Sequence, residues 1–270
     1  MSANLLKKLL LVVAFCCFPL VAFAFGTGAQ GCAGDCTACH KLTREEATEI
    51  FRRLDPGLSV SDISLAPAGG LFQVVVKREG QTMLLYLDFS KKYLFSGKLF
   101  EIATRSDLTQ KTIEESTTVD IAKIPLKDAL VMGNPKGSKV LYVFSDPECP
   151  FCGKLHKDLE QMVKEDPQLK VNVILVPLDI HPNAAWKSNS IVCTSKKSMS
   201  EALSMLEKSF EGGTVKKVDC AGDYAAEIKK KAQELQISMT PMTVFPDGKV
   251  VFGAKGTGEL KKGLEQHQKR

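Results

Sequence analysis

Two cysteines separated by two residues, Cys149-Pro150-Phe151-Cys152, constrain the fold of this 270-residue chain more than any other feature. They follow an apolar stretch, Val140 to Phe144, that predicts a buried strand. They also open a segment that predicts a helix ending before Pro167. Pro150 suits the first helical turn, because its missing N–H would have no partner there. The pattern therefore predicts a strand, an exposed turn and a helix that begins at Cys149.

This arrangement favours redox chemistry over a structural role. Free N–H groups at a helix N-terminus stabilise an anion, so the pKa of Cys149 should fall and its thiolate should attack a disulfide. Cys152 lies one turn further in and is placed to resolve the mixed disulfide. The alternatives are a structural disulfide or half of a zinc site. A zinc site needs four ligands, and Cys193 and Cys220 lack the matching two-residue gap. No metal site is therefore expected.

Strands and helices alternate around this motif. A short helix is expected over Pro125 to Met132. A thioredoxin-like order follows Lys139: strand, helix, strand, a large helical insertion, a hairpin and a final helix. The remaining elements are expected as a strand at 171–176, helices at 182–194, 198–210 and 223–235, hairpin strands at 242–245 and 250–252, and a helix at 259–267.

The chain begins with the pattern of an export signal. Lys7 and Lys8 precede an apolar run over residues 9–20, and Ala22-Phe23-Ala24 offers small residues for cleavage after Ala24. A membrane anchor is the alternative, but the run is short for a span of about 20 residues. We expect residues 1–24 to be a signal peptide that directs the protein to the periplasm. Seven cysteines then remain, an odd number in an oxidising compartment.

A small α+β unit is expected over residues 43–103. Thr43 and Glu46 fit a capping box ahead of a helix with one apolar face. Strands are expected at 71–77, 82–89, 93–95 and 99–102. A unit with so few elements buries little apolar surface by itself, so we expect it to form a dimer. Residues 104–124 are polar and predict a partly helical linker, which leaves 125–270 as the second domain.

Composition narrows the class of partner. The formal net charge is +5 and aromatic residues make up 7% of the chain, with a single Trp. A mild positive charge does not imply a strongly basic binding surface, and so few aromatics offer no stacking array for nucleic acid. Asp146 and Glu148 beside the cysteines are either proton relays or solvated turn residues. His156, two turns along the helix, is interpreted as a surface or groove histidine.

A second motif lies in the Cys-rich extension over residues 25–42. Cys36-Thr37-Ala38-Cys39-His40 has the C-x-x-C-H spacing of covalent haem c attachment, with His40 as an axial ligand. No cytochrome-sized domain follows it. A disulfide among Cys32, Cys36 and Cys39, or a zinc knot of three cysteines and one histidine, are the alternatives.

Residues 145–156, Ser-Asp-Pro-Glu-Cys-Pro-Phe-Cys-Gly-Lys-Leu-His, resemble the active site of the periplasmic disulfide isomerases of the DsbC/DsbG type. The segment 54–100 resembles their N-terminal domain, and Thr240-Pro241 is similar to their substrate-binding cis-proline loop. The resemblance implies an α+β, cystatin-like N-terminal dimerisation domain and an α/β thioredoxin-like catalytic domain with a helical insertion. It also implies a structural disulfide between Cys193 and Cys220.

The resemblance further implies a function. The expected activity is thiol–disulfide exchange, with isomerisation of unfolded or misoxidised exported proteins preferred and no cofactor required. A homodimer and a membrane electron donor of the DsbD type are the implied partners. The Pro-Phe dipeptide is closer to the CPYC of DsbG-like members, so reductase and oxidase roles stay open. A haem-bearing electron-transfer protein on the same fold and a DsbG-like reductase or chaperone are the alternatives.

Overall fold

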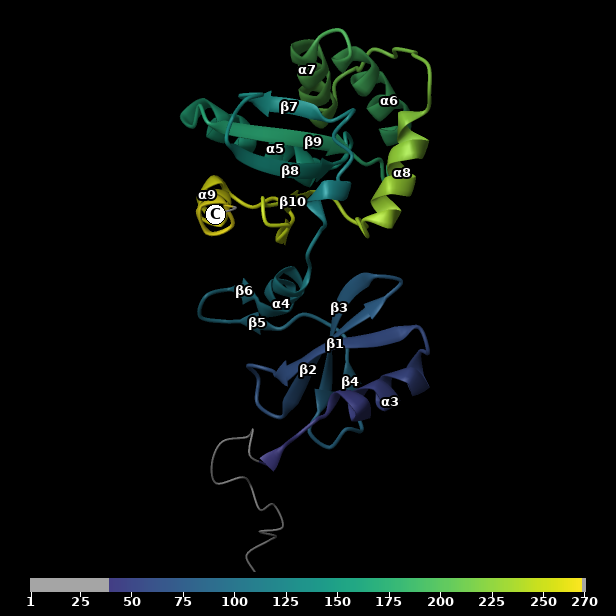
Figure 1. The fold of residues 1–270 in the computed structure, drawn as a ribbon, viewed down its shortest axis with the longest axis vertical. Helices are drawn as coiled ribbons and strands as arrows, with labels where there is room; N and C mark the ends of the chain where they lie inside the picture. The colour runs from purple at the N-terminus through teal and green to yellow at the C-terminus, as the bar shows by residue number, and fades with distance from the viewer. Residues whose placement is uncertain (1–38, 269–270) are drawn as a thin grey trace, which may run out of the picture. The chain divides into compact units, whose positions relative to one another are not determined.

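The structure is a computed structural model that describes residues 39–268 of the chain (Figure 1). The predicted signal peptide, Cys32 and Cys36 lie outside the described residues. The first described helix, α3 (Arg44–Leu54), begins where the capping box predicts. The Thr43 side chain accepts a hydrogen bond from the backbone N–H of Glu46, which satisfies a free donor of the first turn. The apolar face of α3 buries Ala47 and Phe51.

An antiparallel sheet accompanies this helix. Its strands are β1 (Leu58–Leu65), β2 (Leu71–Arg78), β3 (Gln81–Asp88) and β4 (Leu94–Phe95), in that spatial order. Buried Phe72, Val74 and Val76 of β2 join Phe51 in one apolar cluster. The strands expected at 71–77 and 82–89 are present, whereas β1 was not predicted.

Short elements occupy residues 100–123. They are β5 (Phe100–Glu101), β6 (Ser106–Asp107), α4 (Leu108–Ser116) and the 3₁₀ helix η1 (Ile121–Lys123). Asp107 caps α4, because its side chain accepts a hydrogen bond from the backbone N–H of Gln110. The segment expected as a linker is therefore partly helical.

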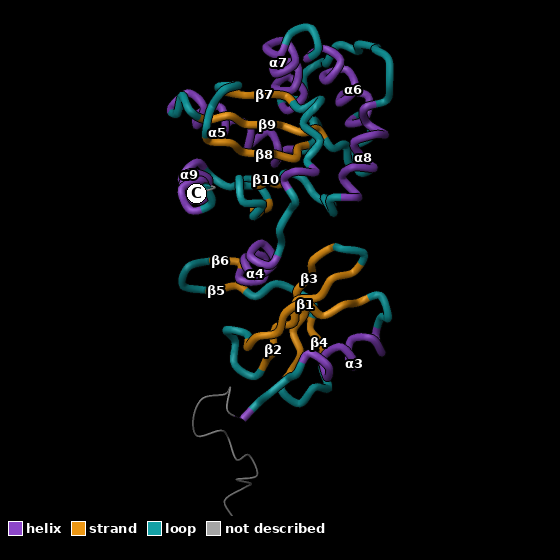
Figure 2. Tube along the Cα trace, in the orientation of Figure 1, coloured by secondary structure: helices purple, strands orange, loops and turns teal. Residues whose placement is uncertain are grey.

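A five-stranded sheet forms the core of the second part of the chain. Its strands are β7 (Leu130–Gly133), β8 (Lys139–Ser145), β9 (Leu169–Leu175), β10 (Met242–Val244) and β11 (Val250–Phe252). They lie in the order β11-β10-β8-β9-β7, and only the β8–β9 pair is parallel. Figure 2 shows β7, β9 and β8 side by side.

The helix predicted over Pro125 to Met132 is wrong, because the end of this segment is strand β7. Leu130 and Met132 are buried and pair with Val173 and Val171 of β9, while Val131 between them is half-buried. The segment thus follows the two-residue period of a strand. Pairing with β9 therefore determines the conformation of this segment, rather than the local pattern that predicted a helix.

Helices cover both faces of this sheet. Leu141 and Val143 of β8 pack with α5 (Pro150–Glu165), α6 (Ala184–Ser195), α7 (Met199–Phe210) and α9 (Thr257–Gln266). Phe144 belongs to a second cluster with Ile228 of α8 (Tyr224–Glu234). We call residues 176–241, between β9 and β10, the helical insertion. The predicted strand–helix order after Lys139 is present.

Candidate active site

The two cysteines of the motif lie where β8 ends and α5 begins. Cys149 is the N-cap of α5, with Pro150 in the first turn. The backbone N–H groups of Cys152 and Gly153 both donate to the carbonyl oxygen of Cys149, at 3.0 and 3.2 Å. We call residues 145–149 the active-site turn. Both cysteines are free thiols and buried, with 5% of Cys149 and 2% of Cys152 exposed.

The two thiols have opposite electrostatic environments. A hydrogen bond from the Cys152 side chain, together with the backbone N–H groups of Cys152 and Phe151, lowers the pKa of Cys149 to about 6. Burial raises the pKa of Cys152 far above its usual range, and the neighbouring Cys149 adds to this. The sulfur of Cys152 accepts a hydrogen bond from the backbone N–H of Asp146 at 3.4 Å. Cys149 is therefore the thiol that ionises first, as an attacking nucleophile must.

A loop far along the chain lies beside Cys149. The Thr240-Pro241 peptide bond is cis, and Cys149 Sγ lies 3.7 Å from the carbonyl oxygen of Thr240. The side chain of Thr240 also contributes a hydrogen bond that helps to lower the pKa of Cys149. Phe151, between the two cysteines, is 64% exposed. Cys149, Cys152 and Thr240 are thus brought together, as the resemblance to the disulfide isomerases implies.

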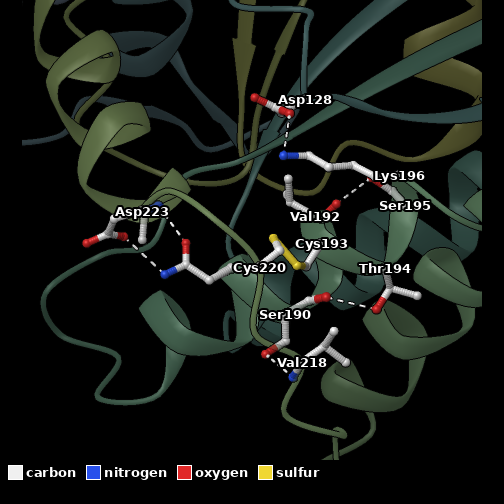
Figure 3. The surroundings of a disulfide bond; sticks show 12 residues. Asp128, Ser190, Val192, Cys193, Thr194, Ser195, Lys196, Val218, Cys220 and Asp223 are labelled. Carbon is white, nitrogen blue, oxygen red and sulfur yellow. Dashed lines mark hydrogen bonds and ion pairs between the residues drawn. A yellow bond between two sulfur atoms is a disulfide. The ribbon is translucent and has the colours of Figure 1, made fainter.

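The structural disulfide that the resemblance implies lies in the helical insertion. Figure 3 shows Cys193 of α6 bonded to Cys220, with a Cα–Cα distance of 5.9 Å. Cys193 is buried and Cys220 is exposed. The backbone N–H of Val218 donates to the hydroxyl of Ser190 at 3.1 Å, which fastens the same segment to α6 a second time.

Asp146 and Glu148, which the sequence leaves as proton relays or solvated turn residues, and Lys187, which the sequence does not single out, form polar contacts around the turn. The carboxylate of Asp146 is fully buried, so its interpretation as a solvated turn residue is wrong. It accepts hydrogen bonds from the backbone N–H groups of Glu148 and Leu178, both at 2.7 Å. Glu148 and Lys187 form an ion pair at 2.7 Å. The acidic residues could be found from their place beside the motif, but Lys187 carries no local signal.

His156 is buried rather than at the surface or in a groove. Its ring lies 5.4 Å from that of Phe210, and burial lowers its pKa. A neutral, packed histidine does not supply charge to Cys149.

The Cys-rich motif enters the described residues only at Cys39 and His40. Cys39 is disulfide-bonded. A sulfur in a disulfide has no free valence for a haem thioether bond, so this observation favours the disulfide alternative. Among residues 39–268 there is no group of three or more His, Cys, Asp or Glu able to hold a metal ion. No helix in the same range is long and apolar enough to cross a membrane.

Comparison with known proteins agrees with this site. A family model described as a thioredoxin-like domain matches residues 126–268, and one described as the N-terminal domain of the disulfide bond isomerase protein matches residues 41–110. The probable thiol:disulfide interchange protein DsbC of Bordetella pertussis is 28% identical over 216 residues, which cover 80% of this chain and 72% of that protein. DsbC of Escherichia coli K12 is 27% identical over 79% of this chain and 84% of its own length.

Solved structures give weaker matches. The disulfide interchange protein from Neisseria gonorrhoeae is 24% identical, with a TM-score of 0.46, over 54% of this chain and 100% of that one. The catalytic domain of Proteus mirabilis ScsC is 19% identical, with a TM-score of 0.49, over 54% of this chain and 93% of that one.

The family matches confirm the predicted fold class, a mixed α+β domain followed by a thioredoxin-like domain. The two free thiols at the start of α5 add the matching site chemistry. The chain therefore belongs to the thioredoxin-like family and is a thiol–disulfide oxidoreductase of the DsbC type.

Proposed function

We propose that the protein isomerises disulfides in exported proteins, with Cys149 as the nucleophile. The placement of Cys149 at the N-cap of α5, with Cys152 buried one turn further in, carries this proposal, and the lowered pKa of Cys149 beside the raised pKa of Cys152 supports it. The Cys149 thiolate attacks a substrate disulfide, forms a mixed disulfide and releases one substrate thiolate. That thiolate attacks another disulfide of the same substrate, and a new attack on the mixed disulfide frees Cys149 again.

Cys152 provides a second way to resolve the mixed disulfide. When no rearrangement occurs, the Cys152 thiolate attacks the sulfur of Cys149. The Cys149–Cys152 disulfide forms and the substrate leaves reduced, so the enzyme must regain two electrons and two protons. We propose a membrane electron donor of the DsbD type as their source. The Thr240-Pro241 loop is the proposed substrate-binding segment, since it lies beside Cys149 and the neighbouring Phe151 is exposed.

A homodimer through residues 43–103 is part of the proposal. Strand β4 is the short edge strand of its sheet, and an edge strand presents unpaired backbone groups. Large apolar side chains are exposed on this strand and in the residues before and after it, and exposed apolar surface of this kind is typical of an interface. These side chains are Tyr93, Leu94, Phe95, Phe100 and Ile102. In such a dimer, the two catalytic domains together would keep a substrate bound long enough for its disulfides to rearrange.

We propose the periplasm as the location. The leader pattern of residues 1–24 supports it, and so does the Cys193–Cys220 disulfide, because such bonds persist in oxidising compartments. A covalent haem at Cys36 and Cys39 is the alternative from another class, and the disulfide at Cys39 argues against it. Mass spectrometry of the peptide that spans Cys32 to Lys41, from protein exported by a host that matures c-type cytochromes, separates haem from a disulfide.

Refolding of a ribonuclease with scrambled disulfides tests the activity. The reduced protein should restore ribonuclease activity, and the Cys149→Ser variant should not. The Cys152→Ser variant should keep part of the isomerase activity, because rearrangement needs only Cys149. Equal rates with the wild type and Cys149→Ser would overturn the proposal.

A further inference from the structure

The active-site turn is tied to the helical insertion at successive residues. The carboxylate of Asp146 accepts the backbone N–H of Leu178 at 2.7 Å, as described above. The carbonyl oxygen of Pro147 accepts a hydrogen bond from the hydroxyl of Ser209 at 2.6 Å, and Ser209 is buried on α7. A buried carbonyl that loses its donor costs free energy, so this contact fixes the turn against α7.

Glu148 makes the third tie and is the residue that adjoins the nucleophile. One carboxylate oxygen accepts the backbone N–H of Asn183 at 2.8 Å, and the other pairs with Lys187 Nζ at 2.7 Å. Only 16% of the Glu148 side chain and 13% of the Lys187 side chain are exposed. Burial alone would raise the pKa of Glu148, but its bonds with Lys187 and Asn183 outweigh burial and lower it. The carboxylate is therefore charged and held at the start of α6.

The position of the turn matters to the chemistry because Cys149 ends it. The thiolate of Cys149 is stabilised by the Cys152 side chain and by the N–H groups of Cys152 and Phe151. These contacts exist only while Cys149 occupies the N-cap position of α5. The Asp146 N–H that reaches Cys152 Sγ belongs to the same turn. A turn that moves would weaken the contacts of both sulfurs.

We propose that Lys187 and Ser209 are positioning residues for thiol–disulfide exchange, which hold the active-site turn through Glu148 and Pro147 so that Cys149 stays at the N-terminus of α5. The inference rests on the proposed function and gives the helical insertion a role in it. Lys187 also neutralises the carboxylate that adjoins the thiolate. Loss of either residue reduces the fraction of Cys149 that is ionised.

Alkylation of Cys149 by iodoacetamide tests the idea without any protein substrate. The full-length reduced protein is titrated, and the rate of alkylation and the ultraviolet absorbance of the thiolate are followed against pH. Lys187→Met keeps most of the length of the side chain but removes the charge. It should raise the pKa of Cys149 and slow alkylation near pH 5 by about threefold to tenfold, the effect of losing a partly buried charge. Lys187→Arg keeps the ion pair and should restore most of the rate.

Ser209→Ala tests the position of the active-site turn separately from the charge of Lys187. It removes the hydrogen bond to Pro147 and changes no charge, and alanine is well tolerated inside a helix. It should slow alkylation in the same direction as Lys187→Met, by a smaller factor. Lys261→Met is the control, because Lys261 pairs with Glu165 at the opposite end of α5. This control should leave the Cys149 titration unchanged.

The outcomes are distinct. If Lys187→Met and Ser209→Ala lower only the melting temperature, and Cys149 in the folded variants titrates as in the wild type, the two residues are merely structural and the inference is overturned. If all variants titrate as expected but the wild type does not isomerise scrambled ribonuclease, the inference stands and the proposed function fails.

Discussion

The sulfur of Cys149 lies 3.7 Å from the carbonyl oxygen of Thr240, although 91 residues separate them in the chain. The sheet explains this approach, since β10 pairs with β8 and places Met242 opposite Phe144. The residues just before β10 therefore lie at the end of the sheet where β8 leads into the active-site turn. A peptide bound along Thr240-Pro241 would present a disulfide to Cys149.

The titration of Cys149 is the first prediction. Because its pKa is lowered to about 6, alkylation of the reduced protein should reach half its maximal rate near that pH. A thiol with the ordinary pKa of 9.0 would reach it near pH 9. Stopped-flow alkylation across the pH range measures this, with Cys149→Ala as the control that removes the fast phase. A midpoint above pH 8 would contradict the site geometry.

The same shift predicts how stability depends on pH. The pKa of Cys149 is lower in the folded state than its ordinary value of 9.0, so ionisation stabilises the reduced protein above that pH. This contribution should decline as the pH falls from 9 towards 6 and be absent below. Cys152 stays protonated in the folded state over that window, and in the unfolded state it ionises only towards the upper end. Denaturant midpoints of the reduced protein should fall across this range, relative to those of Cys149→Ala.

Gly153 is predicted to tolerate no side chain. A Cβ atom there would lie 2.9 Å from Cβ of Phe210, which packs against His156. Gly153→Ala should destabilise the thioredoxin-like domain by about 1–3 kcal/mol. Gly258→Ala in α9 is the matched control, because nothing lies within 4 Å of its Cβ, and it should stabilise slightly. Equal effects of the two changes in urea denaturation would refute the packing argument.

The Cys193–Cys220 disulfide is predicted to be a stabilising bond. It joins residues 27 apart, and a loop of that size corresponds to about 3 kcal/mol of unfolded-state entropy. Replacing both cysteines with alanine should lower the free energy of unfolding by about that amount. Structural disulfides have lower reduction potentials than redox-active pairs, so this bond should outlast Cys149–Cys152 under mild reductant, which peptide mapping can follow. Simultaneous reduction of the two bonds would contradict this ordering.

The exposed apolar edge is predicted to mediate assembly. Leu94→Lys with Phe95→Lys would place two charges on β4 and should convert a dimer into a monomer. Light scattering of the full chain measures the mass. The variant should keep simple reductase activity and lose most of its isomerase activity. A wild type that is already monomeric would refute the predicted dimer.

Local patterns predicted most of the elements, and pairing between distant segments explains the failures. The capping box at Thr43 and the motif at Cys149 each mark a helix start that the structure has. Strand β1 was missed because its register shifts between Val60 and Asp62, which breaks the alternation of Leu58 and Val60 with Ile63 and Leu65.

The residues of the candidate site also fall into two groups, those that a local sequence pattern reveals and those that depend on distant contacts. Cys149 and Cys152 carry their chemistry in four consecutive residues, so the motif alone proposes them. The ties of the active-site turn depend on partners 32 to 62 residues away, Leu178, Lys187 and Ser209. An isolated lysine or serine on a helix has no local feature that indicates such a contact.

Trapping of mixed disulfides tests the central claim, that Cys149 attacks and Cys152 resolves, most directly. The Cys152→Ala variant cannot resolve the intermediate, so it should accumulate covalent complexes with a reducible model substrate on non-reducing gels. The Cys149→Ala variant should form none, because the raised pKa and burial of Cys152 leave it unreactive. Equal trapping by both variants, or trapping by Cys149→Ala alone, would contradict the account.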